Sequence, residues 1–416
     1  MPTDQAGPAT HGGQPVQLKR ALGLGLLTLY GLGVTIGAGI YVLIGAVAAK
    51  AGIFAPASFA VAALVVAFTA FSYAELGSRF PVSAGEAEYA MRGFHARWLA
   101  TIVGLLVAAT GIISAATISI GAASYLETYA ALPRWFLIVC IVIVLGAIAI
   151  RGILESVTLA AVFTLIEMAG LALAIIVGLS SAPQGVAALA PQMPPLDSAI
   201  WAGIFGGSLL AFFAFVGFED IANVAEEVKE PERTIPRAIM LTLAVTLVLY
   251  IAIAAVAVSS IPMDALKSSS APLALIFAKQ PPSLQLSFTA IAAFATLNGV
   301  LIQMIMASRL LFGLARQGNL PKALAHIYGP TQTPAIATLM VMALILSLAL
   351  FFPIADLAKL TSQFVLVVFI VMNASLLRIR LGEAAPPPGI FRIPFFVPVL
   401  GLLASAALLV SGFVFG

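Results

Sequence analysis

Long apolar runs separated by short polar connections make up most of this chain, and sustained alternation of apolar and polar residues is absent. A run of about 20 apolar residues is long enough to cross a bilayer as a helix, whereas strands of an outer-membrane barrel alternate. The pattern predicts eleven spanning helices, at residues 22–49, 54–77, 98–126, 135–150, 157–180, 200–220, 236–260, 286–313, 334–352, 357–377 and 395–414. We therefore expect an all-α integral membrane protein with about 11 transmembrane helices.

The composition supports a membrane protein, because 62% of the residues are hydrophobic and only 9% are charged. Soluble domains carry about 25% charged residues. The single cysteine, Cys140, excludes an intrachain disulfide, and the three histidines are too far apart for a metal-ligand motif. We expect the lipid bilayer as a partner, and no nucleic acid, cofactor or metal centre. The composition does not indicate an oligomeric state.

Basic residues are distributed unevenly between the two sides that the eleven helices define. With a cytoplasmic N-terminus, the only basic residues outside, of 20 in the chain, are Lys50, Arg134, Lys267, Lys279 and Lys359. Cytoplasmic loops carry the excess of lysine and arginine. This bias predicts a multi-pass protein of the cell (plasma) membrane with its N-terminus inside and, after eleven spans, its C-terminus outside.

Two apolar segments are irregular, and each opens a set of five helices. We expect a cytoplasmic disordered tail at 1–21, a first five-helix repeat at 22–180, an extracellular loop at 181–199, a second repeat at 200–378, and a cytoplasmic loop with a terminal helix at 379–416. An odd number of spans per repeat inverts the second relative to the first. Interrupted helices at corresponding positions of inverted repeats indicate a transporter binding site near the membrane midplane.

The first irregular segment, TLYGLGVTIGAGIYV at 28–42, contains four glycines, each of which disfavours a helix interior by roughly 1 kcal/mol relative to alanine. Close helix packing would explain Gly33 and Gly37, which form a Gly-x-x-x-Gly pair. A break in the helix at about 34–39 would instead expose N–H groups at the start of the outer half, and these suit a carboxylate. Under this second interpretation Gly31 and Gly33 serve packing alone, and Gly33→Ala is expected to be mild.

The second irregular segment, AFFAFVGFED at 211–220, ends an apolar helix and contains Gly217 followed by two carboxylates. Carbonyl groups that end the helix near Phe213 to Val216 carry partial negative charge and suit an ammonium group. Two breaks that present opposite helix ends to one cavity describe a receptor for an α-amino acid.

Four stretches resemble, in chain order, the amino acid–polyamine–organocation superfamily of permeases. TIGAGIYVLIGAVAAKAG (35–52) is similar to its first helix, AELGSRFPVSAGEAEYAMRGF (74–94) to the loop after the second, FFAFVGFEDIANVAEEVKEPERTIPRAI (212–239) to the sixth helix and its loop, and ASRLLFGLARQGNLPKALAHI (307–327) to the end of the eighth. The cationic-amino-acid-transporter-like branch is the most similar. The resemblance implies a five-helix inverted-repeat (LeuT-like) core with discontinuous helices 1 and 6, alternating access and amino acid substrates.

The resemblance also implies the residues of the substrate site. The carboxylate of the substrate is expected at Ile36, Gly37, Ala38 and Gly39, and its ammonium near Phe213, Ala214 and Val216. Phe213 resembles the aromatic residue that closes over substrate, although an ordinary core contact would also explain it, and Val216 the residue that shapes the side-chain pocket. The chain departs from the family in two places: many relatives have twelve spans, and many proton-coupled relatives have a lysine where this chain has Glu167.

Glu167 lies near the centre of its predicted helix, where an ionisable residue is functional by default. Burial favours a neutral carboxyl, which makes Glu167 a candidate for proton coupling. If ionised, it would instead help to hold Na⁺ or a cationic substrate, and a neutral glutamic acid that only bonds a neighbouring helix is the structural alternative.

The expected function is a secondary active transporter of amino acids, by proton-coupled symport or exchange. We find no intramembrane pair of catalytic residues, no phosphate loop ending in Gly-Lys-[Ser/Thr] and no repeated filter loop, which argues against an enzyme and a channel. The alternatives are Na⁺ coupling and an amino acid sensor that binds without transport.

Overall fold

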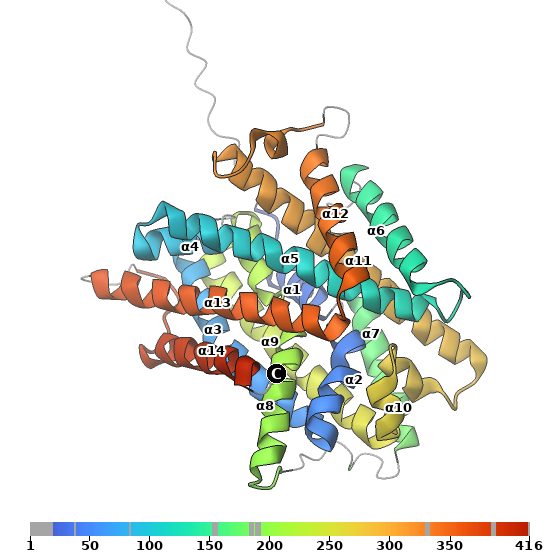
Figure 1. The fold of residues 1–416 in the computed structure, drawn as a ribbon. Helices are drawn as coiled ribbons and strands as arrows, with labels where there is room; N and C mark the ends of the chain where they lie inside the picture. The colour runs from blue at the N-terminus through green and yellow to red at the C-terminus, as the bar shows by residue number, and fades with distance from the viewer. Residues whose placement is uncertain are drawn as a thin grey trace, which may run out of the picture.

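The computed structural model describes residues 20–414 apart from 37–38, 83–84, 152–156, 183–186, 188–192, 329–332 and 384–387. Regular structure within these residues is helical, and extended segments pair only in the isolated bridges Leu22–Val228 and Tyr328–Thr333. Figure 1 shows long helices packed against one another in a bundle. The all-α prediction is therefore confirmed for the described part of the chain.

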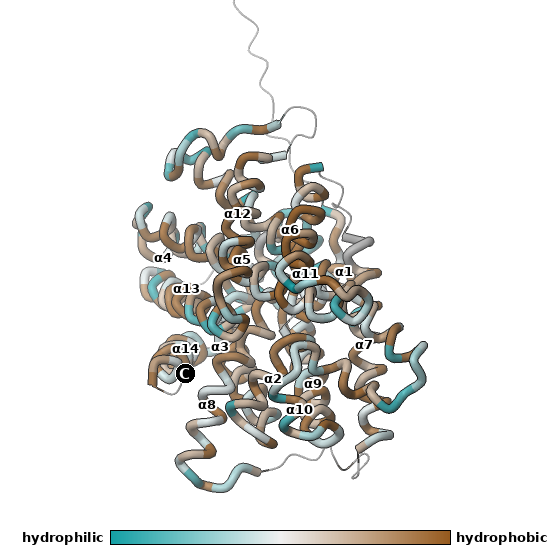
Figure 2. The backbone as a smooth tube through the Cα atoms, turned by 45° about the vertical axis from the view of Figure 1, so that its right-hand side comes forward, coloured by the Kyte–Doolittle hydropathy of each residue, from teal (hydrophilic) through white to brown (hydrophobic). Residues whose placement is uncertain are grey.

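Nine stretches of the described chain are long and apolar enough to cross a membrane. They are Gly39–Arg79, Arg97–Leu126 (α5), Arg134–Arg151 (α6), Ala161–Ser181 within α7 (Val157–Ser181), Ser198–Ala222, Pro231–Ser260 (α9), Pro282–Arg316 (α11), Ile354–Gly382 (α13) and Phe396–Val414 (α14). Figure 2 shows that hydrophobic residues dominate the long helices, and that hydrophilic residues gather in the connections and at helix ends. Two shorter apolar helices, α1 (Leu24–Ile36) and α12 (Ala335–Phe351), lie where spans are also predicted, so the total of eleven stays a prediction.

The stretch Gly39–Arg79 is not one straight helix. It consists of α2 (Gly39–Ala51), the 3₁₀ turn η1 (Gly52–Phe54) and α3 (Ala55–Arg79). Gly52 has a φ of +57°, which favours glycine, and Pro56 lies in the first turn of α3, where its missing N–H is tolerated. This corner reverses the chain and produces two helices where the apolar run is nearly continuous.

Short helices connect the long ones. They are α4 (Gly85–Phe94), α10 (Met263–Ser268), η4 (Pro272–Phe277) and η5 (Lys322–Ala325). The loop that was predicted after the second helix is therefore partly helical, because α4 follows α3. The predicted tail at 1–21 lies outside the described residues except for its last two.

Of the two irregular segments, the second is interrupted within the described residues. The structure describes α1 up to Ile36 and α2 from Gly39, and a break between them stays a prediction because the two residues between lie outside the described chain. Helix α8 (Ser198–Phe213) ends in a turn at Ala214–Gly217, after which the 3₁₀ helix η3 (Phe218–Glu227) begins. The apolar run 200–220, predicted as one spanning segment with an irregular end, is thus only partly α-helical.

Small residues allow the long helices to approach closely. A Cβ on Gly111 of α5 would lie 2.9 Å from the Met306 Cε of α11, and one on Gly77 of α3 would lie 2.9 Å from the Ile235 Cγ2 of α9. Close approach of this kind stabilises helix pairs where no hydrophobic effect drives association. Helices α5 and α11 form one wall of the candidate site described below.

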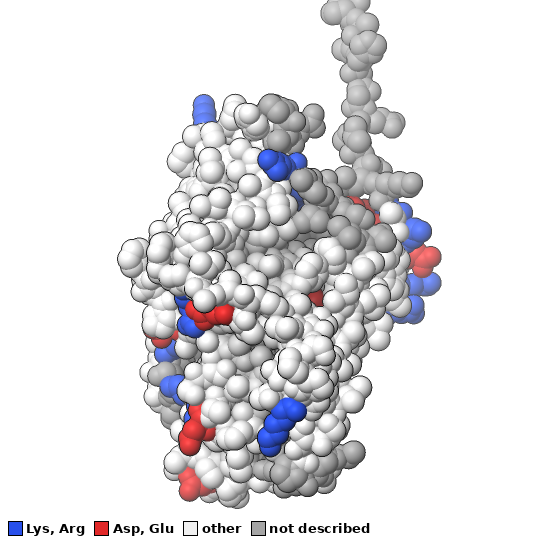
Figure 3. Space-filling model, turned by 90° about the vertical axis from the view of Figure 1, so that its right-hand side faces the viewer, with Lys and Arg blue, Asp and Glu red and all other residues white. Residues whose placement is uncertain are grey.

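A buried charge cluster ties the end of α3 to the end of α13. The Glu75 carboxylate is fully buried and accepts hydrogen bonds from Arg79, Arg380 and the backbone N–H of Ile393. Arg79 also pairs with Glu383 at 2.6 Å. Paired and hydrogen-bonded charges are tolerated in such surroundings. Elsewhere, most of the face in Figure 3 is uncharged, and its charged side chains lie mainly toward the edges.

Candidate functional site

The two interrupted segments cross each other with backbone in direct contact. A Cβ on Gly39 would lie 2.3 Å from the Cα of Ala214, and one on Gly217 would lie 2.9 Å from the carbonyl oxygen of Val34. Gly217 also has a φ of +125°, a backbone conformation that residues with a Cβ rarely adopt. Glycine is therefore required at both crossings for steric reasons, and at Gly217 for conformational ones as well.

Tyr250 of α9 joins the two interruptions through one hydroxyl group. This hydroxyl lies 2.9 Å from the carbonyl oxygen of Thr35 in α1 and 2.9 Å from that of Ala214 after α8. The ring is fully buried and packs against Phe215 and Phe59, with centroid distances of 5.0 and 6.0 Å. Carbonyl groups at helix ends have no partner within the helix, so an external donor satisfies them.

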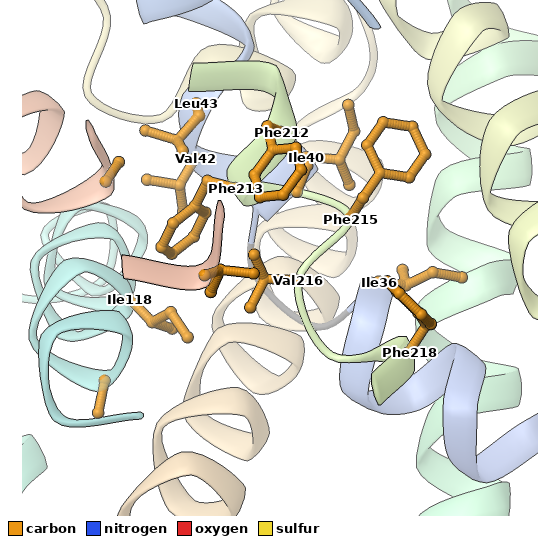
Figure 4. Close-up of a cluster of buried hydrophobic side chains, with 14 of the residues drawn as sticks. Ile36, Ile40, Val42, Leu43, Ile118, Phe212, Phe213, Phe215, Val216 and Phe218 are labelled. Atoms are coloured by element: carbon orange, nitrogen blue, oxygen red, sulfur yellow. The ribbon is translucent and has the colours of Figure 1, made fainter. Parts of the chain in front are cut away.

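A small cavity lies where the interruptions meet helices α5 and α11. Its walls come from both interrupted segments and from these two helices, and consist of Val34, Thr35, Gly39, Ser114, Ile118, Phe213, Val216, Gly299, Ile302 and Gln303. We call it the first cavity. It has room for roughly one water molecule, so a larger ligand requires side chains to move. Figure 4 shows Phe213 and Val216 on the same side as Ile118 of α5, whereas Phe215 points away from them.

The predicted substrate residues are brought together only in part. Gly39, Phe213 and Val216 line the first cavity. Ile36 is fully buried at the end of α1 without lining it, and Ala214 contributes the backbone that meets Gly39. Gly37 and Ala38 lie outside the described residues.

Two of the carbonyl groups that sequence reasoning assigned to an ammonium, those of Phe213 and Ala214, already have donors in this structure. The Phe213 carbonyl accepts the Val216 N–H at 3.2 Å, and the Ala214 carbonyl accepts the Tyr250 hydroxyl. A carbonyl oxygen has two lone pairs, so each retains capacity for one further donor.

Glu167 is buried within the bundle, and its carboxyl reaches α11. Its Oε1 accepts a hydrogen bond from Asn298 Nδ2 at 3.2 Å, and its Oε2 has no hydrogen-bond partner among the described residues. The Tyr41 hydroxyl of α2 donates to the Glu167 backbone carbonyl at 2.8 Å. Glu167 does not line the first cavity, but its neighbour Asn298 precedes Gly299, which does.

Several residues of the site were not identified from the sequence. Tyr250, Ser114 and Ile118 carry no signal in their own helices, because each stands in an ordinary apolar run. Gln303 is one of several polar residues in the sequence of α11, which does not single it out. It lines the first cavity, is 5% exposed, and its Oε1 has no hydrogen-bond partner among the described residues.

The glycines of α1 serve packing, as predicted, but the space around Gly33 is smaller than expected. A Cβ there would lie 2.2 Å from the Thr164 Oγ1, which donates to the Leu29 carbonyl at 3.1 Å. A Cβ on Gly31 would lie 2.6 Å from the Ile221 Cδ1. The expectation that Gly33→Ala is mild is therefore wrong, because the new methyl group must displace a hydrogen-bonded hydroxyl.

The fold and the apolar spans define a multi-pass membrane protein, and the chain matches the family described as "Amino acid permease" over residues 24–416. The chain belongs to this family. The resemblance to the amino acid–polyamine–organocation superfamily is thereby confirmed, as is the expectation of a transporter rather than an enzyme.

Relatives with transport functions cover nearly the whole chain. An uncharacterized transporter of Mycobacterium tuberculosis is 31% identical over 96% of this chain and 91% of its own length. The branched-chain amino acid permease of Bacillus subtilis is 27% identical over 91% of this chain and 85% of its own length. The vacuolar cationic amino acid transporter 2 of Arabidopsis thaliana is 31% identical over 91% of this chain and 62% of its own length.

Proposed function

We propose that this protein is a secondary active transporter that moves amino acids across the plasma membrane by alternating access. The observation that carries the proposal is that both irregular segments line the first cavity, through Gly39 and Phe213. Phe213 ends α8, and in the proposal the first segment is broken just before Gly39, the first described residue of α2. The start of a helix carries partial positive charge and the end carries partial negative charge. Such a pair is complementary to a zwitterion.

In this proposal the substrate carboxylate lies at the start of α2, around Ile36 to Gly39, and the ammonium lies near Phe213, Ala214 and Val216. The glycine at 39 supports it, because a side chain there would collide with Ala214. Phe213 acts as the gate over the bound molecule. Its position supports this role, since it lines the cavity from the end of the interrupted helix.

The substrate side chain faces Ile118, Phe213 and Val216 in this arrangement. These apolar side chains suit an uncharged amino acid of modest size. Among the relatives, one is named for branched-chain amino acids and others for cationic ones, so a neutral side chain is the first class to test and a basic one the second.

The architecture that accompanies this mechanism is a pair of inverted five-helix repeats, residues 22–180 and 200–378, followed by the terminal helix at 395–414. The interruption after Phe213 in the second repeat supports it, as does the glycine-rich segment at the corresponding position of the first. A cytoplasmic N-terminus with an extracellular C-terminus follows from eleven spans and the distribution of basic residues.

Coupling to protons through Glu167 completes the proposal, with Na⁺ as the alternative ion. Its carboxyl is buried and bonded to Asn298 of α11, whose next residue lines the first cavity. A change in the protonation of Glu167 would therefore act on the helix that forms one wall of the site.

Uptake of radiolabelled amino acids into proteoliposomes tests the function directly. A thermal-shift screen of the twenty amino acids, with and without Na⁺ and at two pH values, identifies the ligand, because a bound ligand stabilises the folded protein. Saturable uptake of a stabilising amino acid is expected. Stabilisation without any uptake would contradict transport and favour an amino acid sensor.

A further inference from the structure

A second cavity lies next to the first and shares two of its wall residues, Val216 and Gln303. It is nearer to the beginning of α5 and the end of α11, since it is lined by Val107, Thr110 and Met306 rather than Ser114, Ile118 and Gly299. Its remaining wall is formed by Tyr73, Glu86, Glu219, Asp220, Val365, Val368 and Phe369.

Polar atoms without partners face this cavity. The Oε1 of Gln303 and the Oγ1 of Thr110 are buried and have no hydrogen-bond partner among the described residues. The carboxyl groups of Glu86 and Glu219 lie in the same wall, and these four residues are only 4% to 8% exposed. Asp220 has interactions of its own, so the site is argued without it. Buried acceptors without donors are costly, which makes the cavity a receptor for a group that donates hydrogen bonds.

The rest of the wall decides what kind of donor fits. Valine, methionine and phenylalanine side chains supply about half of it, and they suit an alkyl chain better than a hydrated ion. No group of three or more His, Cys, Asp or Glu residues within the described chain is arranged to hold a metal ion. The ring of Tyr73 adds an aromatic surface, which attracts organic cations.

We propose that the second cavity is a binding site for the ammonium group of an alkylammonium ion, held by Glu86, Glu219 and the unpaired oxygens of Gln303 and Thr110. An ammonium group is about the size of a water molecule and carries the N–H donors that the Gln303 and Thr110 oxygens lack. The Glu86 and Glu219 carboxyls each accept a hydrogen bond already, from the Tyr73 hydroxyl and the Gly217 N–H, and retain capacity for another. The cavity has room for roughly one or two water molecules, enough for this group, and the alkyl chain requires side chains of the wall to move apart.

The charge state of Glu86 gives the site a pH dependence. Burial raises the pKa of Glu86 to about 7, against the opposing effects of its own backbone N–H and the Tyr73 hydroxyl. The other charged group that faces it is Glu219, with which it interacts electrostatically. An ammonium ion displaces a proton from Glu86, so its affinity rises as the pH increases through about 7.

The role of this site in transport rests on the proposed function: it holds the ammonium end of an amino acid that has passed Val216 and Gln303. Binding itself does not depend on transport. The two proposals can therefore fail separately. The ammonium site is tested by stabilisation with a simple amine, and the transport function is tested by uptake.

The test is a thermal-shift titration of the purified full-length protein with n-butylammonium chloride at pH 8. Stabilisation is expected for the wild type and for Glu88→Gln, because Glu88 lies on the same helix but pairs with Arg92 at the surface. Glu86→Gln is expected to weaken binding by about tenfold or more, as for loss of a charged hydrogen-bond acceptor. Thr110→Val, which keeps the side-chain shape, is a second variant should Glu86→Gln fail to fold.

Two further ligands identify the group that is recognised. Tetramethylammonium chloride has the same charge but no N–H donor, and sodium chloride controls for ionic strength; neither is expected to stabilise the protein. Equal stabilisation by sodium or by tetramethylammonium would overturn the assignment, as would stabilisation by butylammonium that persists unchanged in the Glu86 and Thr110 variants.

Discussion

Gly39 at the start of α2 and Ala214 after the end of α8 meet backbone to backbone, with no room for a side chain between them. A Cβ on Gly39 would lie 2.3 Å from the Cα of Ala214. Each of the two interrupted segments therefore sets the position of the other. The first cavity lies beside this contact, because Gly39 also lines it.

The first prediction is that Gly39→Ala abolishes amino acid binding and lowers the unfolding temperature. The obstacle is backbone, which cannot turn aside, and overpacking of this kind costs about 1–3 kcal/mol. Gly313→Ala on α11 is the matched control, because a Cβ there meets nothing within 4 Å. Thermal unfolding with and without substrate measures both effects, and unaltered binding in Gly39→Ala would contradict the crossing.

Gly33→Ala is predicted to destabilise the protein through Thr164. The new methyl group would lie 2.2 Å from the Thr164 Oγ1. Replacing Thr164 by alanine as well removes the obstructing hydroxyl, so the double variant should lose less stability than the two single changes added together. If the decreases in unfolding temperature of the two single variants add up to that of the double variant, the clash is relieved in some other way.

Tyr250→Phe is expected to keep the aromatic packing but leave the Thr35 and Ala214 carbonyls without their shared donor. Loss of one buried partner costs about 1–3 kcal/mol. The KM for substrate should rise, because both carbonyls belong to helix ends beside the first cavity. Tyr125→Phe is the control, since its hydroxyl donates to the Tyr41 carbonyl at 2.6 Å within α2; it should lose stability with no change in KM.

Glu167→Gln is predicted to abolish uptake driven by a pH gradient and to leave substrate exchange intact. The glutamine keeps an oxygen for Asn298 Nδ2 but cannot bind and release a proton. Both activities are measured in the same proteoliposomes, so the exchange assay is an internal control for folding. Gradient-driven uptake at the wild-type rate would exclude Glu167 as the proton carrier.

Glu86 is expected to make the protein less stable as the pH rises. Its folded pKa of about 7 lies above the usual value of 4.5, so the folded state favours the protonated carboxyl. The contribution of Glu86 to the free energy of unfolding is fully present below pH 4.5. It is lost as the pH increases to about 7, and the loss totals roughly 3 kcal/mol. Unfolding temperatures measured across this range should become less dependent on pH in Glu86→Gln, whereas Glu88→Gln should follow the wild type.

Much of the fold could be predicted from the sequence, because a membrane-spanning helix is recognised by the length and apolar composition of its segment. The interruption after Phe213 was also predictable, since glycine and paired carboxylates stand where an apolar helix should continue. The break expected after Ile36 falls on residues outside the described chain and stays a prediction. The corner at Gly52 and the helix α4 were less visible, because turns of a few residues leave only weak local signals. The 3₁₀ form of η3 has no sequence signature that separates it from an α-helix.

The residues of the candidate site also divide into those that the sequence identifies and those that it does not. Gly39, Phe213 and Val216 belong to the irregular segments and were identified from them. Tyr250 and Ser114 come to the same site from helices whose sequences are ordinary apolar runs. Their presence there depends on how helices distant in the sequence pack together. Glu86 was not identified either, because a carboxylate in a polar loop is usually solvated, and only the packing of α4 against α5 and α13 buries it.

Val216 and Gln303 belong to the walls of both cavities, and this shared membership determines what separates the two compartments. The residues that the two cavities share include no charged side chain. Side chains exchange rotamers far faster than helices tilt. Under the proposed transport function, we expect passage between the compartments to need only a local rearrangement of a valine and a glutamine, and the slow step of the cycle to lie at the outer boundaries, where whole helices must part.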